Sequence, residues 1–123
     1  MAGQAHHFRQ YAPIKIKYAI KRYTDEVNRL YGVMNKQLKK NEFLAGRYSI
    51  ADMACWGWII PWKNQGQKIS DFPHLKRWFE KVGQRPAVIK GFAAGKEMRK
   101  QLLSENTKEA KKAKSILFNQ RSR

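Results

Sequence analysis

The chain has 123 residues, one cysteine and a formal net charge of +17 at pH 7. This length fits a single domain with a substantial core, and one cysteine excludes a framework of internal disulfides and is typical of a reducing compartment. No apolar run reaches the roughly 18 residues that a membrane span needs, and the first residues lack the order of a signal peptide, so the sequence predicts a cytoplasmic protein.

The positive charge is spread along the whole chain. Nine Lys or Arg and three Asp or Glu lie between residues 96 and 123, so this part carries +6 and the remainder carries +11. A nucleic-acid-binding surface is usually a clustered patch or stripe of cations. The spread of charge therefore favours non-specific attraction to polyanions over a dedicated nucleic-acid site.

Residues 1–13 indicate either an irregular lead-in or the end of a helix that began upstream. From residue 16 onward, apolar side chains recur at spacings of three and four, which predicts one long amphipathic helix. These side chains are Ile16, Ile20, Tyr23, Val27, Leu30, Met34 and Leu38. Lys39, Lys40 and Asn41 suit the C-terminus of this helix, where cations and a residue that tolerates the left-handed conformation are favoured.

The segment from Tyr48 to Asp52 predicts the start of a second helix. The Ser49 hydroxyl can accept from the backbone N–H three residues on, and Asp52 can reach back to the N–H of Ser49, which makes a capping box. Tyr48 and Met53 are spaced to form a hydrophobic staple across this start. The following residues, up to about Ile60, are apolar on nearly all sides. We therefore predict that this helix is buried at the centre of a bundle.

The rest of the chain predicts shorter elements. Pro61 ends the second helix because its ring clashes with the carbonyl four residues back, and a polar loop follows over 63–71. Another helix starts near Phe72, and Pro86 is well placed in the first turn of a short further helix.

Beyond Gly95 the sequence is mostly polar and predicts one or two marginal helices, partly mobile. Strand-like alternation and hairpin signals are missing from the sequence, so the predicted class is all-α. We expect one helical domain over 1–95 and a basic C-terminal extension over 96–123 that packs loosely on it.

Two segments, FLAGRYSIADMACWGW and DFPHLKRWFEKVGQRPAV, closely resemble the helical C-terminal domain of cytosolic glutathione transferases. The opening GQAHHFRQYAP, the AIKRY of the long helix and the closing LFNQR resemble in particular the bacterial nu-class branch, which consists of glutathione-dependent disulfide-bond reductases. The resemblance covers residues 1 to about 95 closely and the tail loosely. It implies a helical bundle whose usual neighbour, a thioredoxin-like N-terminal domain, is absent from these residues. The chain is then either part of a longer enzyme, with Met1 at an internal methionine, or a helical domain that stands alone.

The resemblance implies a parent enzyme that uses glutathione as co-substrate, transfers it to small electrophiles or reduces disulfides with it, and forms a homodimer. It places no catalytic residue in this chain, which alone would be inactive because the domain that activates the thiolate is missing. The alternative is a stand-alone interaction module. Similar helical domains serve as docking units in translation-factor and aminoacyl-tRNA-synthetase assemblies, and +17 suits an anionic or translation-related partner.

Arg22 matches the arginine with which this branch reaches a carboxylate of glutathione. A guanidinium suits that role because its planar fork pairs bidentately with a carboxylate and stays charged. Asp25 and Glu26 lie three and four residues further on and offer the alternative of a solvated helix face, in which Arg22 pairs within its own helix. Both readings are open at this point.

The resemblance also places His6, His7, Phe8 and Tyr11 near the mouth of the active-site cleft, where they would line the substrate site. Packing against the absent domain is the alternative. His6 and His7 are adjacent and cannot both face one metal from a regular helix, so no metal site is predicted. Trp62 is a further candidate for lining the cleft.

Cys55 lies in the middle of a helix among aromatic residues, so we expect a buried and unreactive thiol. The resemblance implies that the working thiol belongs to glutathione. The four tryptophans could stack on single-stranded nucleic acid or pack in a core. We interpret Trp56, Trp58 and Trp78 as core residues and Trp62 as the exception.

Overall fold

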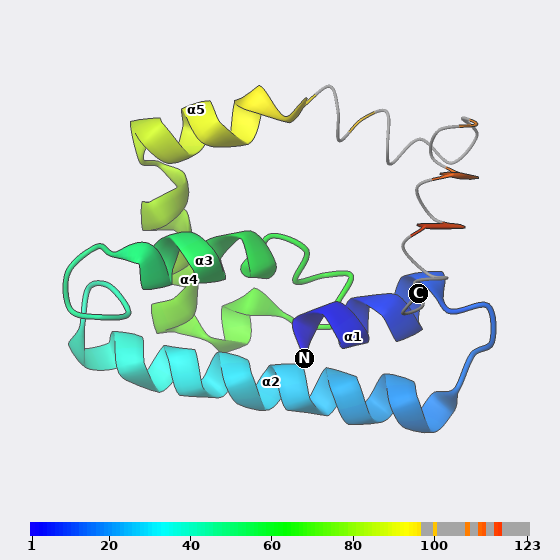
Figure 1. The fold of residues 1–123 in the computed structure, drawn as a ribbon. Coiled ribbons are helices and arrows are strands. Elements are labelled where there is room, and N and C mark those ends of the chain that lie inside the picture. The colour runs from blue at the N-terminus through cyan, green and yellow to red at the C-terminus, as the bar shows by residue number, and fades with distance from the viewer. Residues whose placement is uncertain (97–99, 101–107, 109–110, 113–114, 117–123) are drawn as a thin grey trace. The chain divides into compact units, whose positions relative to one another are not determined.

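The computed structural model describes residues 1–96, 100, 108, 111–112 and 115–116 (Figure 1). It contains two compact units, Met1–Gln84 and Arg85–Arg123. The all-α class is confirmed, since the described residues form helices and, besides them, only isolated β-bridges near Gly46. No helix among the described residues has the length and apolar character needed to cross a membrane. Most of the predicted extension lies outside the described residues, and the boundary after residue 95 stays a prediction.

The long helix α2 (Lys17–Lys40) confirms the periodicity of the sequence and organises the first unit. It buries Val27, Tyr31 and Leu38, and α1 packs along it (Figure 1). Helix α1 (Ala2–His6) continues directly into a single π-helical turn, η1 (His7–Tyr11). The opening of the chain is therefore helical up to Tyr11, so the irregular lead-in is wrong for residues 2–11.

Helices α2 and α4 (Pro73–Gly83) cap each other. The side-chain oxygen of Asn35 on α2 accepts from two backbone N–H groups in the first turn of α4, at 2.9 and 3.0 Å. In return, Arg77 on α4 donates to the carbonyls of Leu38 and Asn41 at the end of α2, at 2.7 and 2.9 Å. The helix ends at Lys40 with Asn41 as its C-cap, as predicted, and Asn41 is extended, with φ −126°, rather than left-handed. Arg77 supplies the polar partner for the last carbonyls instead.

The capping box at the start of α3 (Ile50–Ile59) is confirmed, although Ser49 accepts from the N–H two residues on rather than three. Ser49 Oγ accepts from the N–H of Ala51 at 3.2 Å, and Asp52 Oδ2 accepts from the N–H of Ser49 at 2.9 Å. The helix ends two residues before Pro61, as predicted. The staple stays a prediction: the ring of Tyr48 packs edge-on against Phe43, with centroids 5.5 Å apart, and Met53 is 58% exposed.

The prediction that α3 is buried on all sides is wrong. Only Asp52 and Ile59 of this helix are buried, whereas Ile50 is 82% exposed and Trp58 is 58% exposed. One side of α3 packs on α4, where Trp56 stacks on Phe79 with ring centroids 5.7 Å apart. The opposite side is uncovered within the described part of the chain. An apolar sequence indicates that a helix face can be buried, but it does not show which other element packs against that face.

In the second unit, α5 (Pro86–Ala94) has the predicted proline in its first turn. Arg85, the residue before it, is extended, as residues that precede proline usually are. The helix is followed by Gly95, and none of its residues is buried.

Candidate functional site

Aromatic and imidazole rings from the opening helix meet the start of α2. The rings of His6 and Tyr11 lie 5.1 Å apart, and those of His7 and Phe8 meet edge to face at 5.2 Å. Phe8 in turn stacks on Tyr23 of α2, with centroids 5.4 Å apart and ring planes within 7° of parallel. Burial lowers the pKa of His6 below its ordinary value, which favours the neutral imidazole. The structure thus pairs the four predicted cleft residues of this segment with one another, and Phe8 connects them to Tyr23, the neighbour of Arg22 in the sequence.

Arg9 ties this opening segment to α2 and to the turn that follows α3. Its Nε donates to the carbonyl of Asn64 at 3.2 Å, and its Nη1 donates to Thr24 Oγ1 at 3.4 Å. The guanidinium lies so close to Gly66 that a Cβ there would be 2.6 Å from Arg9 Cζ. Trp62 lies on the same turn, with Lys63 Nζ 5.2 Å from its ring centroid. Sequence reasoning did not single out Arg9, because its partners are 15 and 55 residues away.

Replacing Gly66 with alanine should destabilise the chain more than the same change at Gly46. Both glycines have positive φ, +73° and +82°, and an alanine costs about 1 kcal/mol or more in this region. Only Gly66 also lies under Arg9, whereas a Cβ at Gly46 meets nothing within 4 Å. We expect losses of about 2 kcal/mol for Gly66→Ala and about 1 kcal/mol for Gly46→Ala in urea unfolding. Equal losses would show that the Arg9 contact contributes nothing.

Two buried glutamines of the predicted polar loop fix the turn against α2 and α3. Gln65 Oε1 accepts from the Tyr31 hydroxyl at 2.8 Å, and its Nε2 donates to the carbonyl of Trp58 at 2.8 Å. Gln67 Nε2 donates to the carbonyl of Thr24 at 3.0 Å. Burial also raises the pKa of Tyr31, which keeps its hydroxyl a donor. The turn that carries Trp62 is therefore held rigidly by side chains that point inward.

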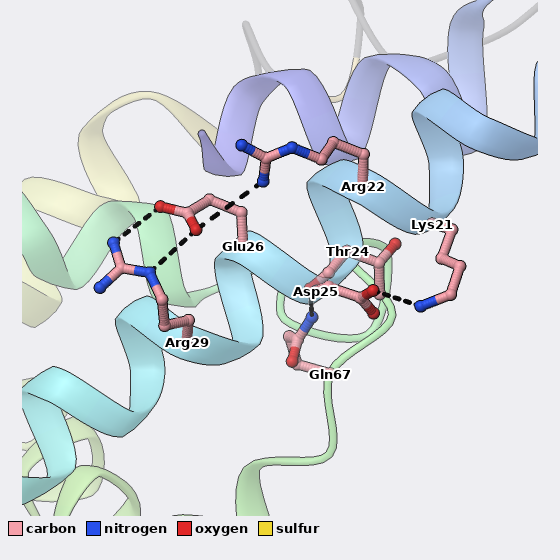
Figure 2. A network of polar contacts seen from close by, with 7 residues as sticks. All are labelled: Lys21, Arg22, Thr24, Asp25, Glu26, Arg29 and Gln67. Atoms are coloured by element: carbon pink, nitrogen blue, oxygen red, sulfur yellow. Dashed lines mark hydrogen bonds and ion pairs between the residues drawn. The ribbon is translucent and has the colours of Figure 1, made fainter.

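Arg22 lies in a chain of charged residues along one side of α2 (Figure 2). Its Nη1 is 3.9 Å from Glu26 Oε2, and its side chain is 56% exposed. Arg29 holds the same carboxylate much more closely, through hydrogen bonds of 2.9 and 2.8 Å. The hydrogen bond from Arg29 is the main cause that lowers the pKa of Glu26. Asp25, the other partner considered for Arg22, pairs with Lys21 at 2.5 Å.

Cys55 is half-buried rather than fully buried. It borders an apolar hollow of about 260 Å³ between α1, α2 and α3. Burial, and secondarily the charge of Asp52, raises the pKa of the thiol, so it stays protonated and weakly nucleophilic near neutral pH. Among the described residues, no three His, Cys, Asp or Glu side chains converge as metal ligands.

This arrangement of helices belongs to a known class. The family model of the glutathione S-transferase C-terminal domain matches residues 7–86, and the chain belongs to this family. Among its relatives, the disulfide-bond oxidoreductase YfcG of Escherichia coli is 48% identical over 89 residues, covering 72% of this chain and 41% of the relative. The disulfide-bond oxidoreductase YghU of the same organism is 42% identical over 99 residues, covering 74% of this chain and 34% of the relative.

Solved structures agree with this assignment. Ure2p in complex with glutathione superimposes with a TM-score of 0.68 at 37% identity, covering 72% of this chain and 46% of that one. The glutathione transferase URE2P6 from Phanerochaete chrysosporium, in complex with oxidized glutathione, has a TM-score of 0.71 at 32% identity, covering 78% and 46%. The chain spans less than half the length of each of these four relatives.

Proposed function

We propose that this chain is the helical half of a glutathione-dependent enzyme that reduces disulfides or transfers glutathione to small electrophiles. The proposal is supported by the two disulfide-bond oxidoreductases and by the two glutathione complexes to which the chain is similar. The chain would form one wall of the substrate site, lined by the predicted cleft residues. These are His6, His7, Phe8, Tyr11 and Trp62. The parent protein would be a homodimer.

The proposal rests above all on the exposure of Arg22 and on its weak pairing within the chain. Its guanidinium is more than half exposed and makes only a loose contact with Glu26, so its fork is available to another anion. In the sequence of α2, Arg22 comes directly before Tyr23, the residue whose ring stacks on Phe8. Glutathione carries two carboxylates, and an arginine fork pairs bidentately with such a group. We propose that Arg22 binds one of these carboxylates.

Replacing Arg22 with alanine should weaken glutathione binding about tenfold, since a hydrogen bond to a charged group contributes about 1.5–3 kcal/mol. The measurement is a titration of the isotope-labelled chain with reduced glutathione, followed by NMR. Lys21→Ala is the matched control because it removes one cation from the preceding position, whose side chain is 78% exposed. We expect it to leave the affinity within about twofold. Tight binding that is unaffected by Arg22→Ala would refute the role of Arg22.

We further propose that these 123 residues do not turn over alone. The thiol of Cys55 is held protonated and borders an apolar hollow, so it is poorly suited to attack a disulfide. The working thiol would be that of glutathione, stabilised by groups that the helical residues do not provide.

The alternative of a docking module for an anionic partner is less well supported. The best candidate is a hollow of about 390 Å³ at the end of α2, lined by polar and charged residues. Of its cations, Arg77 already donates to two backbone carbonyls and Lys81 pairs with Glu42. Lys39 and Lys40 remain as solvated cations at a helix C-terminus, where they are expected for the helix dipole alone.

A further inference from the structure

Two arginines on α2 share the carboxylate of Glu26 unequally (Figure 2). Arg29 donates to both of its oxygens, from Nε to Oε2 at 2.9 Å and from Nη2 to Oε1 at 2.8 Å. The nearest nitrogen of Arg22 is 3.9 Å from Oε2, which is beyond hydrogen-bond distance. The Glu26 side chain is only 17% exposed, so its position is confined between its neighbours.

The order of the charges along the helix explains this division. An acidic residue placed before its basic partner interacts more favourably on a helix than the reverse order does. Glu26 precedes Arg29 by three residues, whereas Arg22 precedes Glu26 by four. The fork of Arg29 also takes one lone pair on each oxygen, and a bidentate pair of this kind fixes the carboxylate in place. Glu26 is therefore directed toward Arg29 and away from Arg22.

We propose that Arg29 is a positioning residue that keeps the guanidinium of Arg22 available by occupying Glu26. This inference rests on the proposed function of Arg22 as a ligand of a glutathione carboxylate. Without Arg29, Glu26 would pair with Arg22 within the helix. An incoming carboxylate would then have to displace Glu26 and would meet its uncompensated negative charge.

The first test needs no glutathione. The protonation of Glu26 is followed by NMR through its carboxyl carbon while the pH is changed. The effect of Arg22→Ala on this titration is measured twice, once in the natural 123-residue chain and once in the chain that carries Arg29→Ala. We expect Arg22→Ala to shift the titration midpoint of Glu26 little in the natural background and clearly more in the Arg29→Ala background. An equal shift in the two backgrounds would overturn the proposed competition.

The second test measures glutathione affinity in the same chain. Arg29→Ala should weaken binding about threefold, and adding Glu26→Gln should restore it, since the competing carboxylate is then removed. Lys21→Ala is the control for a general loss of positive charge, because Lys21 pairs with Asp25 on the same helix. It should leave the affinity within about twofold.

The outcomes separate the two proposals. Weaker binding in Arg29→Ala that Glu26→Gln does not restore would mean that Arg29 acts through its own charge, and the positioning role would be wrong. A second outcome is that Arg22→Ala shifts the Glu26 titration more in the Arg29→Ala background, as expected, but leaves the glutathione affinity unchanged. This outcome would refute the proposed role of Arg22. The role of Arg29 toward glutathione would fall with it, although the competition for Glu26 would stand.

Discussion

Replacing Asp52 with alanine should destabilise the first unit by about 3–5 kcal/mol, a large part of the stability of a small domain. Its carboxylate is fully buried and accepts from three N–H groups. They are the backbone N–H groups of Leu44 and Ser49, at 3.0 and 2.9 Å, and Trp78 Nε1, at 2.7 Å. Trp78 is itself fully buried, so its indole N–H finds no water when the carboxylate is removed. Urea unfolding followed by circular dichroism measures the loss.

Three further variants test this explanation. Asp52→Asn keeps the size of the side chain but turns an N–H₂ toward a donor, and we expect a loss of about 2–3 kcal/mol. Asp25→Ala is the surface control, because this carboxylate is 60% exposed, and it should change stability by less than about 0.5 kcal/mol. Trp78→Phe removes the indole donor, so its cost and that of Asp52→Ala should be less than additive. Full additivity would contradict the proposed coupling.

Acid should remove the contribution of the Asp52 carboxylate to the free energy of unfolding. Burial alone would raise the pKa of Asp52, but hydrogen bonds from Leu44, Trp78 and Ser49 outweigh it and hold the pKa below its ordinary value. The carboxylate therefore stabilises the fold fully above its unfolded pKa of about 3.9, and this stabilisation is lost as the pH falls through the lower folded pKa. The free energy of unfolding should accordingly fall less steeply with acid in Asp52→Asn than in the natural chain.

The contacts of Asp52 show which structural features the sequence could predict and which it could not. Its bond to Ser49 was predictable because the two residues are three apart and a capping box has a fixed spacing. Its bond to Trp78 joins residues 26 positions apart, and no local pattern connects them. Local signals likewise predicted α2 from its period and α5 from Pro86, because each depends on neighbours within a turn or two.

The errors have a common physical cause. The sequence shows that α3 is apolar, but the exposure of Ile50 and Trp58 depends on which other elements lie beside it. Within the candidate site, Arg22 was found only through the resemblance, since an arginine followed by two carboxylates is ordinary on a helix surface. Arg9 could not be found, because its role depends on how the turn at Gly66 is placed in space.

Replacing Gln65, the fully buried glutamine in the turn after α3, should also cause a large loss of stability. Gln65 is fully buried, and both ends of its amide are used, by the hydroxyl of Tyr31 and by the carbonyl of Trp58. Gln65→Ala leaves both partners unsatisfied and opens a cavity, so we expect a loss of about 2–4 kcal/mol in urea unfolding. Gln4→Ala, at an exposed glutamine of α1, is the control and should change stability by less than about 0.5 kcal/mol.

Tyr31→Phe separates the hydrogen bond from the packing around Gln65. It removes the hydroxyl but keeps the buried ring, which also packs edge-on against Phe72 with centroids 5.6 Å apart. If the unsatisfied hydroxyl accounts for part of the cost of Gln65→Ala, the double variant should be more stable than the sum of the single losses predicts, by about 1 kcal/mol. Simple addition would mean that the cavity alone sets the cost. Because Gln65 holds the turn that carries Trp62, Gln65→Ala should also broaden the NMR signals of residues 62–67 in the folded chain.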